Sequence, residues 1–553
     1  MPKDNDWILN SFAYDSTFSR DFLAYNLSSN LGQYACRGKH CEIIVNDVYY
    51  GIYMLTEQIK VGSDRVNITK MSTSDTADAK LTGGYITQCD RPNPNEQPAW
   101  QYPNSTILNF VDFVHVSPQA HLITTKQNDF IKSQFDALTT AAAQKNSSIA
   151  NGYSSIIDVP TFVDFMLLNE LTSNVDAYQF STYFHKDRNG KLRAGPVWDF
   201  NRACGRDEFA NGSITTGFQV TDADGNGADF WRDLFNNEAF HCYVAKRWEE
   251  LSASGMPLSY ASIAHVIDSV SNVIDEARTG RLGRDHLAID TMKTWFQDRV
   301  NWLNANLKST KCSFPSVHPI VISKINYNPL PSGTYTSSQL EFIELTNNGN
   351  AAIDVSGYYF RELGFTYVFP NNSLIPANGK IYLASNTAAF TAIYGVAPFA
   401  EYSRTLSNTS EKLVLADAYG NIADYVQYQS ASPWPTAANG TGAYLKLKDV
   451  NLDNSLASSW EVATNNPVGT DELGSDNVIS IYPNPAHEQV TVSSHQFIFK
   501  YEIYDQLGRL VQSESNIQSA NLNINLKALE ANTYILKMIS SNQNPTYFKV
   551  IKY

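Results

Sequence analysis

The sequence predicts three folded domains: an α+β domain over residues 1–312, and β-rich domains over residues 316–466 and 476–553. Three observations support this division. The first segment mixes β-rich runs with amphipathic helical stretches, whereas the later segments alternate short β-rich runs with turn clusters. All six cysteines fall before residue 313. Residues 467–475 begin with a proline and contain two glycines, which predicts a linker.

Composition excludes several classes of protein. With 41 basic and 55 acidic residues the net charge is −14, and no basic run occurs, so nucleic acid is not an expected partner. A hydrophobic content of 43% against 17% charged residues excludes a disordered chain. The sequence has no run of 18 apolar residues, so no transmembrane helix is expected. It has no Cys-x-x-Cys pair, so no structural zinc site is expected.

The α+β assignment of the first domain depends on a hairpin and several helices. Residues 42–55 form two β-rich runs around Asn46-Asp47, the pattern of a hairpin. Asp158 followed by Pro160 predicts a helix start, and apolar residues continue at helical spacing to Leu171. Further amphipathic helices are expected over residues 230–235, 243–251, 263–277 and 292–307.

The two later domains are assigned from strands and turns. Strands are expected at residues 320–322, 341–345, 380–383, 412–415 and 424–426, with Asn- and Gly-containing turns between them. Strands recurring at such intervals predict a β-sandwich. In the last domain, residues 505–509 predict a hairpin turn.

Two cysteine pairs are candidates for disulfides. Cys36 and Cys41 lie on either side of an expected turn, and Cys242 and Cys312 lie on or near expected helices. Free buried thiols are the alternative for both pairs, since the redox compartment decides. Cys204 has no His at a helpful spacing, which favours a packing role over a nucleophilic one.

Two carboxylates mark the candidate site of the first domain. Asp176 follows an expected helix, Asp199 follows an expected β-hairpin, and the two are 23 residues apart. Flanking one hairpin, they could converge at its open end. Phosphoryl transfer uses such a pair, one carboxylate accepting the hydroxyl proton and the other holding Mg²⁺. Turn and capping carboxylates are the alternative reading.

A second acidic stretch resembles an EF-hand calcium loop. Asp222, Asp224 and Asn226 stand at loop positions 1, 3 and 5, and Asp233 stands at position 12. A Ca²⁺ site there is one hypothesis, and a flexible acidic loop is the other.

The first domain resembles the spore-coat protein H (CotH) kinase-like family. The resemblance rests on several motifs in the same order: residues 2–10, 18–21, 46–53, 55–60, 65–68, 83–86 and 196–201. It implies an atypical protein-kinase-like fold that transfers the γ-phosphoryl group of ATP to Ser or Thr of a protein. Asp176 would match the catalytic-loop Asp, and Asp199 the Mg²⁺-binding Asp.

The resemblance also implies the remaining site residues. Glu57, Lys60 and Arg65 would lie near the nucleotide, with a surface ion pair of Glu57 and Lys60 as the alternative. Asn201 and Ser181 would add Mg²⁺ ligands, at positions where the family often has Asp and Asn. The family normally carries an upstream nucleotide-binding stretch. The chain is therefore expected to be an N-terminal truncation or to have a misassigned start, and to be weak or inactive as written.

The other two domains also resemble known families. Residues 320–440 resemble the lamin tail domain, an immunoglobulin-like β-sandwich, through segments such as 341–347 and 353–358. Residues 478–553 resemble the C-terminal sorting domain of the type IX secretion system, through segments such as 482–485 and 529–537. This implies export to the outer-membrane surface or the medium, with the type IX machinery as a partner. Such cargo requires a signal peptide, and residues 1–6 do not begin one.

Taken together, the sequence predicts an exported CotH-like protein with an ATP- and Mg²⁺-dependent protein Ser/Thr kinase domain. The alternative is a non-catalytic surface adhesin or scaffold that binds protein or glycan.

Overall fold

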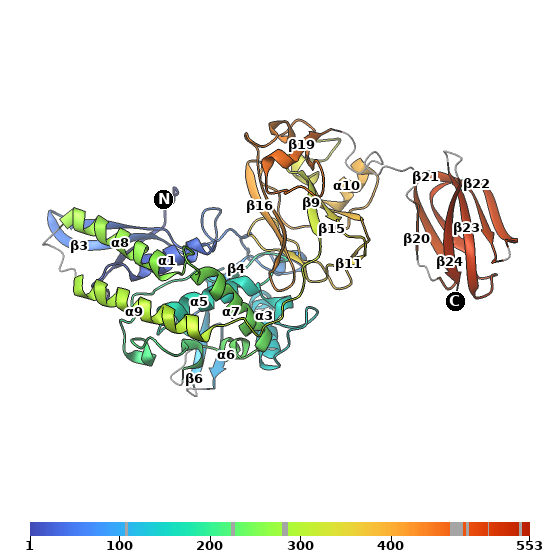
Figure 1. Ribbon diagram of the computed structural model, residues 1–553. Helices are drawn as coiled ribbons and strands as arrows, with labels where there is room; N and C mark the ends of the chain where they lie inside the picture. Colours follow the sequence, from blue (N-terminus) through green and yellow to red (C-terminus); the bar gives the residue numbers. More distant parts are fainter. Residues whose placement is uncertain are drawn as a thin grey trace. The chain divides into compact units, whose positions relative to one another are not determined.

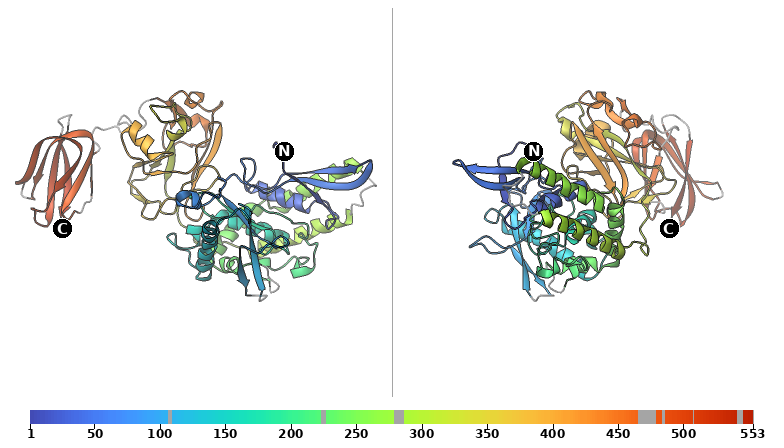
Figure 2. Two further views of the ribbon diagram at one scale, coloured as in Figure 1. Left: turned by 180° about the vertical axis from the view of Figure 1, so that it is seen from behind. Right: turned by 60° about the vertical axis from the view of Figure 1, so that its left-hand side comes forward.

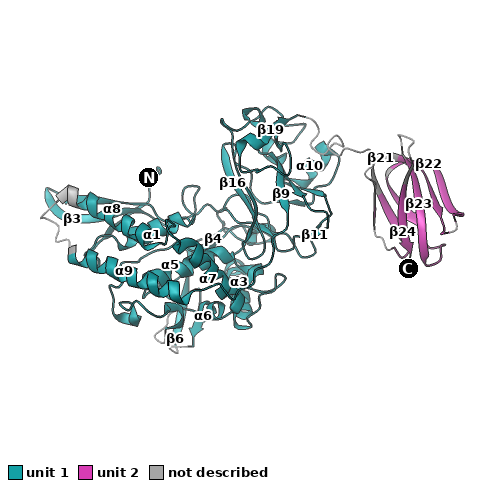
Figure 3. Ribbon diagram, in the orientation of Figure 1, with its two compact units in different colours: residues 1–464 teal, residues 465–553 magenta. Residues whose placement is uncertain are grey.

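The computed structural model describes residues 1–105, 109–222, 227–278, 286–464, 479–482, 486–506, 508–540 and 545–552 (Figure 1). It divides into two compact units, residues 1–464 and residues 465–553 (Figure 3). Within the first unit there are two separate hydrophobic cores, one before residue 308 and one after residue 319. The expected linker at residues 467–475 lies outside the described residues.

The first part of unit 1 is α+β, as predicted, and contains two antiparallel sheets. One has the strand order β1-β3-β2 and the other β5-β6-β4-β7-β8. The strands are β1 (Trp7–Ser11), β2 (Gly38–Val45), β3 (Val48–Glu57), β4 (Tyr85–Cys89), β5 (Trp100–Asn104), β6 (Asn109–Ser117), β7 (Thr182–Lys186) and β8 (Arg193–Ala194). The helices are α1 (Arg20–Asn30), α2 (Asp78–Leu81), α3 (Thr125–Ala143), α4 (Tyr153–Ile156), α5 (Val159–Thr172), α6 (Phe230–Phe235), α7 (Glu238–Ser252), α8 (Tyr260–Arg278) and α9 (His286–Asn306).

Two local predictions are confirmed with their physical causes. The β2–β3 hairpin turns at Asn46 and Asp47, whose φ angles of 49° and 64° suit the short polar side chains that tolerate this region. The Asp158 side chain accepts a hydrogen bond from the backbone N–H of Thr161, which caps α5, and Pro160 lies in its first turn.

Helix α5 is the central element of the first core. All of its residues are buried except Pro160, because β8 of the five-stranded sheet and helices α1, α7 and α9 pack around it. Figure 2 shows the teal and green helices of this part packed against one another. Phe162 and Phe165 pack against Trp231 of α6, with ring centroids 5.1 and 5.5 Å away. A helix enclosed on all sides is mainly apolar, as α5 is, and its buried Asp164, Asn169 and Glu170 are each hydrogen-bonded.

The second part of unit 1 is a β-sandwich, as predicted. A six-stranded sheet has the order β15-β14-β10-β9-β18-β19, a three-stranded sheet has the order β12-β16-β17, and β11 pairs with β13. Side chains of both larger sheets share one core. The elements are β9 (Ile320–Asn326), β10 (Phe342–Asn347), β11 (Ile353–Asp354), β12 (Tyr359–Phe360), β13 (Leu374–Ile375), β14 (Lys380–Ala384), α10 (Thr387–Tyr394), β15 (Ala400–Glu401), β16 (Ser410–Ala416), β17 (Ile422–Gln429), β18 (Tyr444–Leu447) and β19 (Trp460–Ala463).

Polar contacts join the two parts of unit 1. Arg404 of the sandwich donates to the backbone oxygen of Asn67 at 2.6 Å and to Asp187 at 3.1 Å. The buried Lys191 ammonium donates to the backbone oxygen of Ser154 at 2.8 Å and to that of Ala418 in the sandwich at 3.0 Å. The two cores are therefore separate, but the surfaces around them are held together.

Unit 2 is β-rich, as predicted. Its strands are β20 (Ile479–Tyr482), β21 (Gln489–Tyr504), β22 (Leu510–Asn525), β23 (Asn532–Ser540) and β24 (Pro545–Lys552). The expected turn at residues 505–509 joins β21 to β22, and Asp505 N donates to Arg509 O at 3.0 Å.

The cysteines resolve the alternatives left open by the sequence. Cys242 of α7 and Cys312 form a disulfide, with their Cα atoms 5.6 Å apart. Cys36 and Cys41 are free, so the bridge considered for them does not form. Cys204 is buried, and burial raises the pKa of its thiol to about 12, consistent with a packing role.

Replacing both Cys242 and Cys312 with Ser should destabilise unit 1. The disulfide closes a loop of 70 residues, and loops of this length stabilise a fold by about 2–4 kcal/mol. Chemical denaturation of the double variant under oxidising conditions measures the loss. Cys41→Ser is the matched control and should unfold like the parent; equal stability of all three proteins would contradict the prediction.

Lys191 should make stability depend on pH. Burial lowers its pKa from 10.5 to about 7, so between these values the folded chain binds fewer protons than the unfolded chain. The free energy of unfolding therefore rises with pH across this window, by on the order of a few kcal/mol. Below the window Lys191 is protonated in both states and adds no pH dependence. Lys191→Met should lack the rise in denaturation experiments. Lys412→Met, at a half-exposed lysine, should retain it; a rise that persists in Lys191→Met would refute this assignment.

Candidate functional site

The candidate site lies where α5 ends. Ser173 takes a left-handed conformation (φ 46°) that stops the helix, and the loop over residues 173–181 carries Asp176 before β7 begins. After β8, residues 195–198 lead to Asp199, five residues beyond the end of that strand. Cys204 N donates to Thr172 O at 2.6 Å, which ties the segment after Asp199 to the end of α5.

The buried carboxylate of Glu170 supports the loop over residues 173–181. Glu170 accepts hydrogen bonds from the Tyr178 hydroxyl at 2.8 Å, from Gln219 N at 2.7 Å and from Val220 N at 2.9 Å. Arg299 of α9 lies 3.6 Å from its carboxylate and donates to its backbone oxygen. Burial raises the pKa of Glu170, and these donors oppose that rise. The Asp176 loop is therefore anchored through Tyr178.

Asp176 and Asp199 act on each other electrostatically. Burial raises the pKa of Asp199, and the negative charges of Asp176 and Asp90 raise it further. Burial also raises the pKa of Asp176, which the Arg202 guanidinium opposes. Carboxylates that repel one another at a partly buried site form the kind of environment that a cation relieves.

Asp90 is a site residue that the sequence analysis missed. It follows β4, which pairs with β7 so that Cys89 lies opposite Thr182. This register places Asp90 beside Ser181, whose backbone N–H donates to its carboxylate at 3.3 Å. The available signal was a carboxylate directly after a strand, but only the pairing of two strands 93 residues apart in register shows where it lies.

The carboxylate cluster of Asp90, Asp176 and Asp199 has specific polar partners. The Asn201 side-chain amide donates to Asp199 Oδ1 at 2.5 Å. Arg202 lies 3.1 Å from Asp176 and 2.7 Å from Asp207, so it bridges these two carboxylates. The structure thus brings Asp176, Asp199 and Asn201 of the predicted set into one region, with Ser181 joined to it through Asp90.

The backbone at this site is constrained. Tyr178, Ser181 and Asp199 have φ angles of 68°, 49° and 62°, a region that costs a residue with a side chain about 1 kcal/mol or more. Such conformations persist only when surrounding contacts enforce them. These backbone conformations set the direction of the short segments that carry the carboxylates.

Helix α1 supports Asp199 from the other side. Asp21 accepts a hydrogen bond from Phe200 N at 2.5 Å, and Tyr25 stacks on Trp198 with ring centroids 5.8 Å apart. Burial, followed by the charge of Asp199, raises the pKa of Asp21 to about 7. The contacts to Trp198 and Phe200 hold both neighbours of Asp199.

A cleft opens beside the cluster. One cavity of about 470 Å³ is lined by Trp198, Tyr183, Gln58 and Ile59, and it continues into a second of about 640 Å³ lined by Lys60 and Lys70. Gln58, Ile59, Val116 and Gln119 line both, so the two cavities form one cleft. The charges of Asp90 and Asp199 raise the pKa of Tyr183 along with burial, which places this wall near the carboxylates.

The three residues expected near a nucleotide are linked by ion pairs through Asp4, which lies 3.1 Å from Arg65 and 2.6 Å from Lys60, but they do not line one cavity. Glu57 is buried and pairs with Arg65 at 2.7 Å and with Arg37 at 2.8 Å. Lys60 contacts Asp4 and Asp6 instead of Glu57, so the alternative ion pair of Glu57 and Lys60 does not form. Lys60 lines the cleft, whereas Arg65 lines a different cavity of about 220 Å³.

The predicted calcium loop lies partly outside the described residues, which exclude Asp224 and Asn226. Asp222 accepts a hydrogen bond from Asn211 at 2.8 Å, and Asp233 lies in α6. Among residues that the structure describes, no group of three or more His, Cys, Asp or Glu side chains forms a metal site. The calcium hypothesis therefore stays a prediction.

Three family models match the chain. Residues 1–308 match CotH kinase protein, residues 314–430 match the Lamin Tail Domain, and residues 480–552 match the Secretion system C-terminal sorting domain. No curated protein matches the chain.

Solved structures give only slight similarities. PorZ, a surface component of the type IX secretion system of Porphyromonas gingivalis, aligns at 11% identity and a TM-score of 0.13, over 40% of this chain and 36% of its own. Latent PorU from the same organism aligns at 14% identity and a TM-score of 0.16, over 44% of this chain and 21% of its own. The BSP domain of a biofilm-associated protein aligns at 12% identity and a TM-score of 0.13, over 47% of this chain and 55% of its own. This chain thus spans about a third of PorZ, and scores this low support no structural argument.

The sorting domain establishes where the protein goes. It is exported by type IX secretion to the cell surface or beyond. Within the described residues, no helix has both the length and the apolar character needed to cross a membrane. The CotH kinase model covers more than half of the 553 residues, and the chain therefore belongs to the CotH kinase protein family.

Proposed function

We propose that residues 1–308 transfer the γ-phosphoryl group of ATP to a Ser or Thr hydroxyl of a protein outside the cell. The observation that carries the proposal is the electrostatic coupling of Asp176 and Asp199 beside a cleft walled by Tyr183 and Trp198. Aromatic walls suit a purine base, and paired carboxylates suit the chemistry of phosphoryl transfer.

The residues present fit Mg²⁺ with a nucleotide. Mg²⁺ is usually held by one or two carboxylates, with substrate phosphates and water completing its shell. Asp199 and the Asn201 side chain supply oxygen donors, and Ser181 lies one hydrogen bond from the same cluster. When bound, the ion would neutralise phosphate charge. Lys60 and Lys70 line the far part of the cleft; Lys60 is already paired with Asp4 and Asp6, so Lys70 is the cation that would offset charge there.

Asp176 is assigned the role of general base. The raised pKa that burial gives it makes its carboxylate a better proton acceptor for the substrate hydroxyl. Arg202 holds Asp176 Oδ1 at 3.1 Å, which keeps the carboxylate ionised and sets its direction. Asp90 positions the loop by accepting from Ser181 N.

A non-catalytic surface scaffold is the second candidate function. The ion pair with Arg202 occupies one oxygen of Asp176, an arrangement that also suits a purely structural carboxylate. In addition, the β2–β3 hairpin exposes Ile44 and Tyr50 at 63% and 57%, large apolar surfaces that often mark binding sites for proteins.

Radiolabel transfer should separate the two functions. With γ-labelled ATP, Mg²⁺ and surface proteins of the same cell, the full chain should label itself or an acceptor. Asp176→Ala should reduce the rate by about 100-fold or more, because it removes the proton acceptor. Asp136→Asn, at a half-exposed carboxylate paired with Lys132, is the control and should keep full activity. Absence of label and of any thermal stabilisation by ATP with Mg²⁺ would favour the scaffold.

Asp199→Asn should stabilise the metal-free protein. It removes one of the mutually repelling carboxylates, and Asn tolerates the positive φ at this position, so a gain on the order of 1 kcal/mol is expected in denaturation with a chelator present. Added Mg²⁺ should stabilise the parent and not the variant. Asp505→Asn, in unit 2, should behave like the parent in both conditions. If Mg²⁺ stabilised Asp199→Asn as strongly as the parent, Asp199 would not be its ligand.

A further inference from the structure

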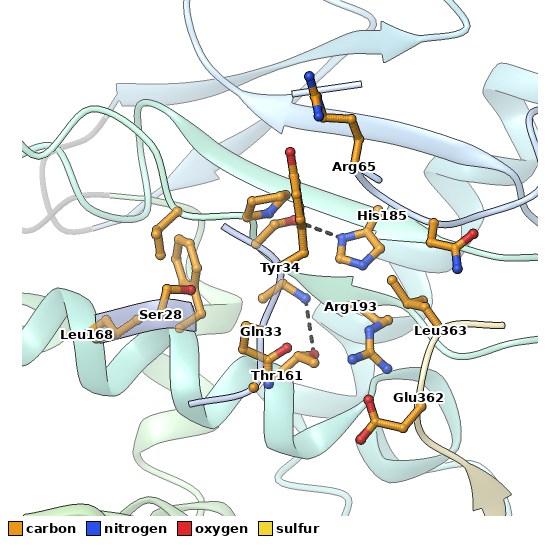
Figure 4. A pocket seen from close by; sticks show the side chains of 17 residues that line it. Ser28, Gln33, Tyr34, Arg65, Thr161, Leu168, His185, Arg193, Glu362 and Leu363 are labelled. Atoms are coloured by element: carbon orange, nitrogen blue, oxygen red, sulfur yellow. Dashed lines mark hydrogen bonds between the residues drawn. The ribbon is translucent and has the colours of Figure 1, made fainter. Parts of the chain in front are cut away.

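A second cavity lies apart from the cleft, between the two parts of unit 1. Its volume is about 220 Å³, and its walls come from α1, α5, β7, β8 and residues 362–363 of the β-sandwich (Figure 4). Leu363 packs against the core of the first part, so the sandwich closes this side. Glu362 also lines the cavity; its side chain is 35% exposed, and its Oε1 lies 3.5 Å from Lys412 Nζ.

His185 presents a hydrogen-bond acceptor to this cavity. Its Nδ1 lies 2.9 Å from Gly195 O, and since a carbonyl only accepts, Nδ1 carries the proton. Burial lowers the pKa of His185 to about 3, so the ring is neutral and Nε2 is a lone-pair acceptor. His185 is 6% exposed, and in the described part of the chain its Nε2 has no partner.

Arg193 presents a donor. Its Nη1 is engaged by Asp158 at 2.8 Å and by Arg361 O at 2.5 Å. Its buried Nε–H finds no partner among the described atoms. Figure 4 shows Glu362 beside Arg193 on the sandwich side, so a second acceptor lies next to this donor.

The rest of the lining is mixed, because Ser28, Gln33, Arg65, Asn67 and Thr161 contribute polar side chains beside the apolar and aromatic ones. Tyr34, Phe165, Leu168 and Leu363 all line the cavity. Figure 4 shows Tyr34 next to His185. The cavity thus combines flat apolar surface with separate single donors and acceptors.

This combination selects one ligand chemistry. An anion would meet the lone pair of a neutral His185 and the carboxylate of Glu362. The charges of the two lining arginines are already balanced, Arg193 by Asp158 and Arg65 by Glu57 and Asp4. A cation would meet Arg193. A hydroxyl group both donates and accepts, so neighbouring hydroxyls on one ring can donate to His185 Nε2 and Glu362 while accepting from Arg193 Nε. The C–H faces of such a ring pack against apolar walls.

We propose that this cavity binds one neutral sugar unit, with His185 and Arg193 of the kinase-like part and Glu362 of the sandwich as its polar partners. Binding there does not depend on the phosphoryl transfer proposed above. It assigns the β-sandwich a role in completing a ligand site, because neither part supplies all three groups.

Calorimetric titration of the full chain with glucose, galactose, mannose and N-acetylglucosamine tests the proposal. At least one should bind saturably. Glu362→Ala and His185→Phe should each weaken binding by about tenfold, because each removes an acceptor. His185→Gln should restore part of the affinity, since the amide oxygen accepts again. Glu461→Ala, at a half-exposed carboxylate elsewhere on the sandwich, should bind as the parent does.

Hydrogen exchange in the unmodified chain tests the site independently of whether the buried His185 variants fold. Sugar added to the unmodified chain should slow exchange of the backbone amides at residues 193–195, 197 and 361–363. The proposal is overturned if none of the four sugars binds, if affinity is unchanged in both Glu362→Ala and His185→Phe, or if the slowed amides lie elsewhere. A cavity that holds only water would give the first of these results.

Discussion

The candidate site depends on one buried ion pair. Glu170, in the last turn of α5, would be unstable in the core without the donors that surround it. Arg299 from α9, Tyr178 from the Asp176 loop and two backbone N–H groups from residues 219–220 all converge on it. Three segments distant in sequence are thereby held at the end of one helix. The strained backbone around Asp176 is tolerated because this network enforces it.

Residues 195–199 run from the cavity beside the β-sandwich to the cleft. Gly195, Pro196 and Val197 line the cavity beside the β-sandwich, and Trp198 lines the cleft next to Asp199. Asp21 and Tyr25 of α1 hold this segment at Phe200 and Trp198. Because this segment is short and held at both ends, contacts made in the first cavity bear on the position of Asp199, which follows the cleft residue Trp198.

The β-sandwich is attached to the α+β part of unit 1 by specific polar contacts. Arg404, Arg193 and Lys191 each reach a backbone oxygen or a carboxylate across the boundary. Lys191 is buried, and Arg193 and Arg404 are partly buried, so these groups need their partners in place, which favours one arrangement of the boundary. Two domains that would fold around separate cores thus share one structured surface.

The sequence by itself determined the local elements: the Asn46-Asp47 turn, the capped start of α5 and the alternating strands of both later domains. These follow from side chains acting within a few residues, and the resemblance of the motifs to a known family singled out Asp176 and Asp199 as candidates. Only the tertiary structure decided that Asp90 joins them, that Glu57 pairs with Arg65 rather than Lys60, and that Cys242 bonds Cys312. Each of these depends on strand register or helix packing between segments far apart in the chain, because distances between such segments are set by the fold and leave no trace in local sequence.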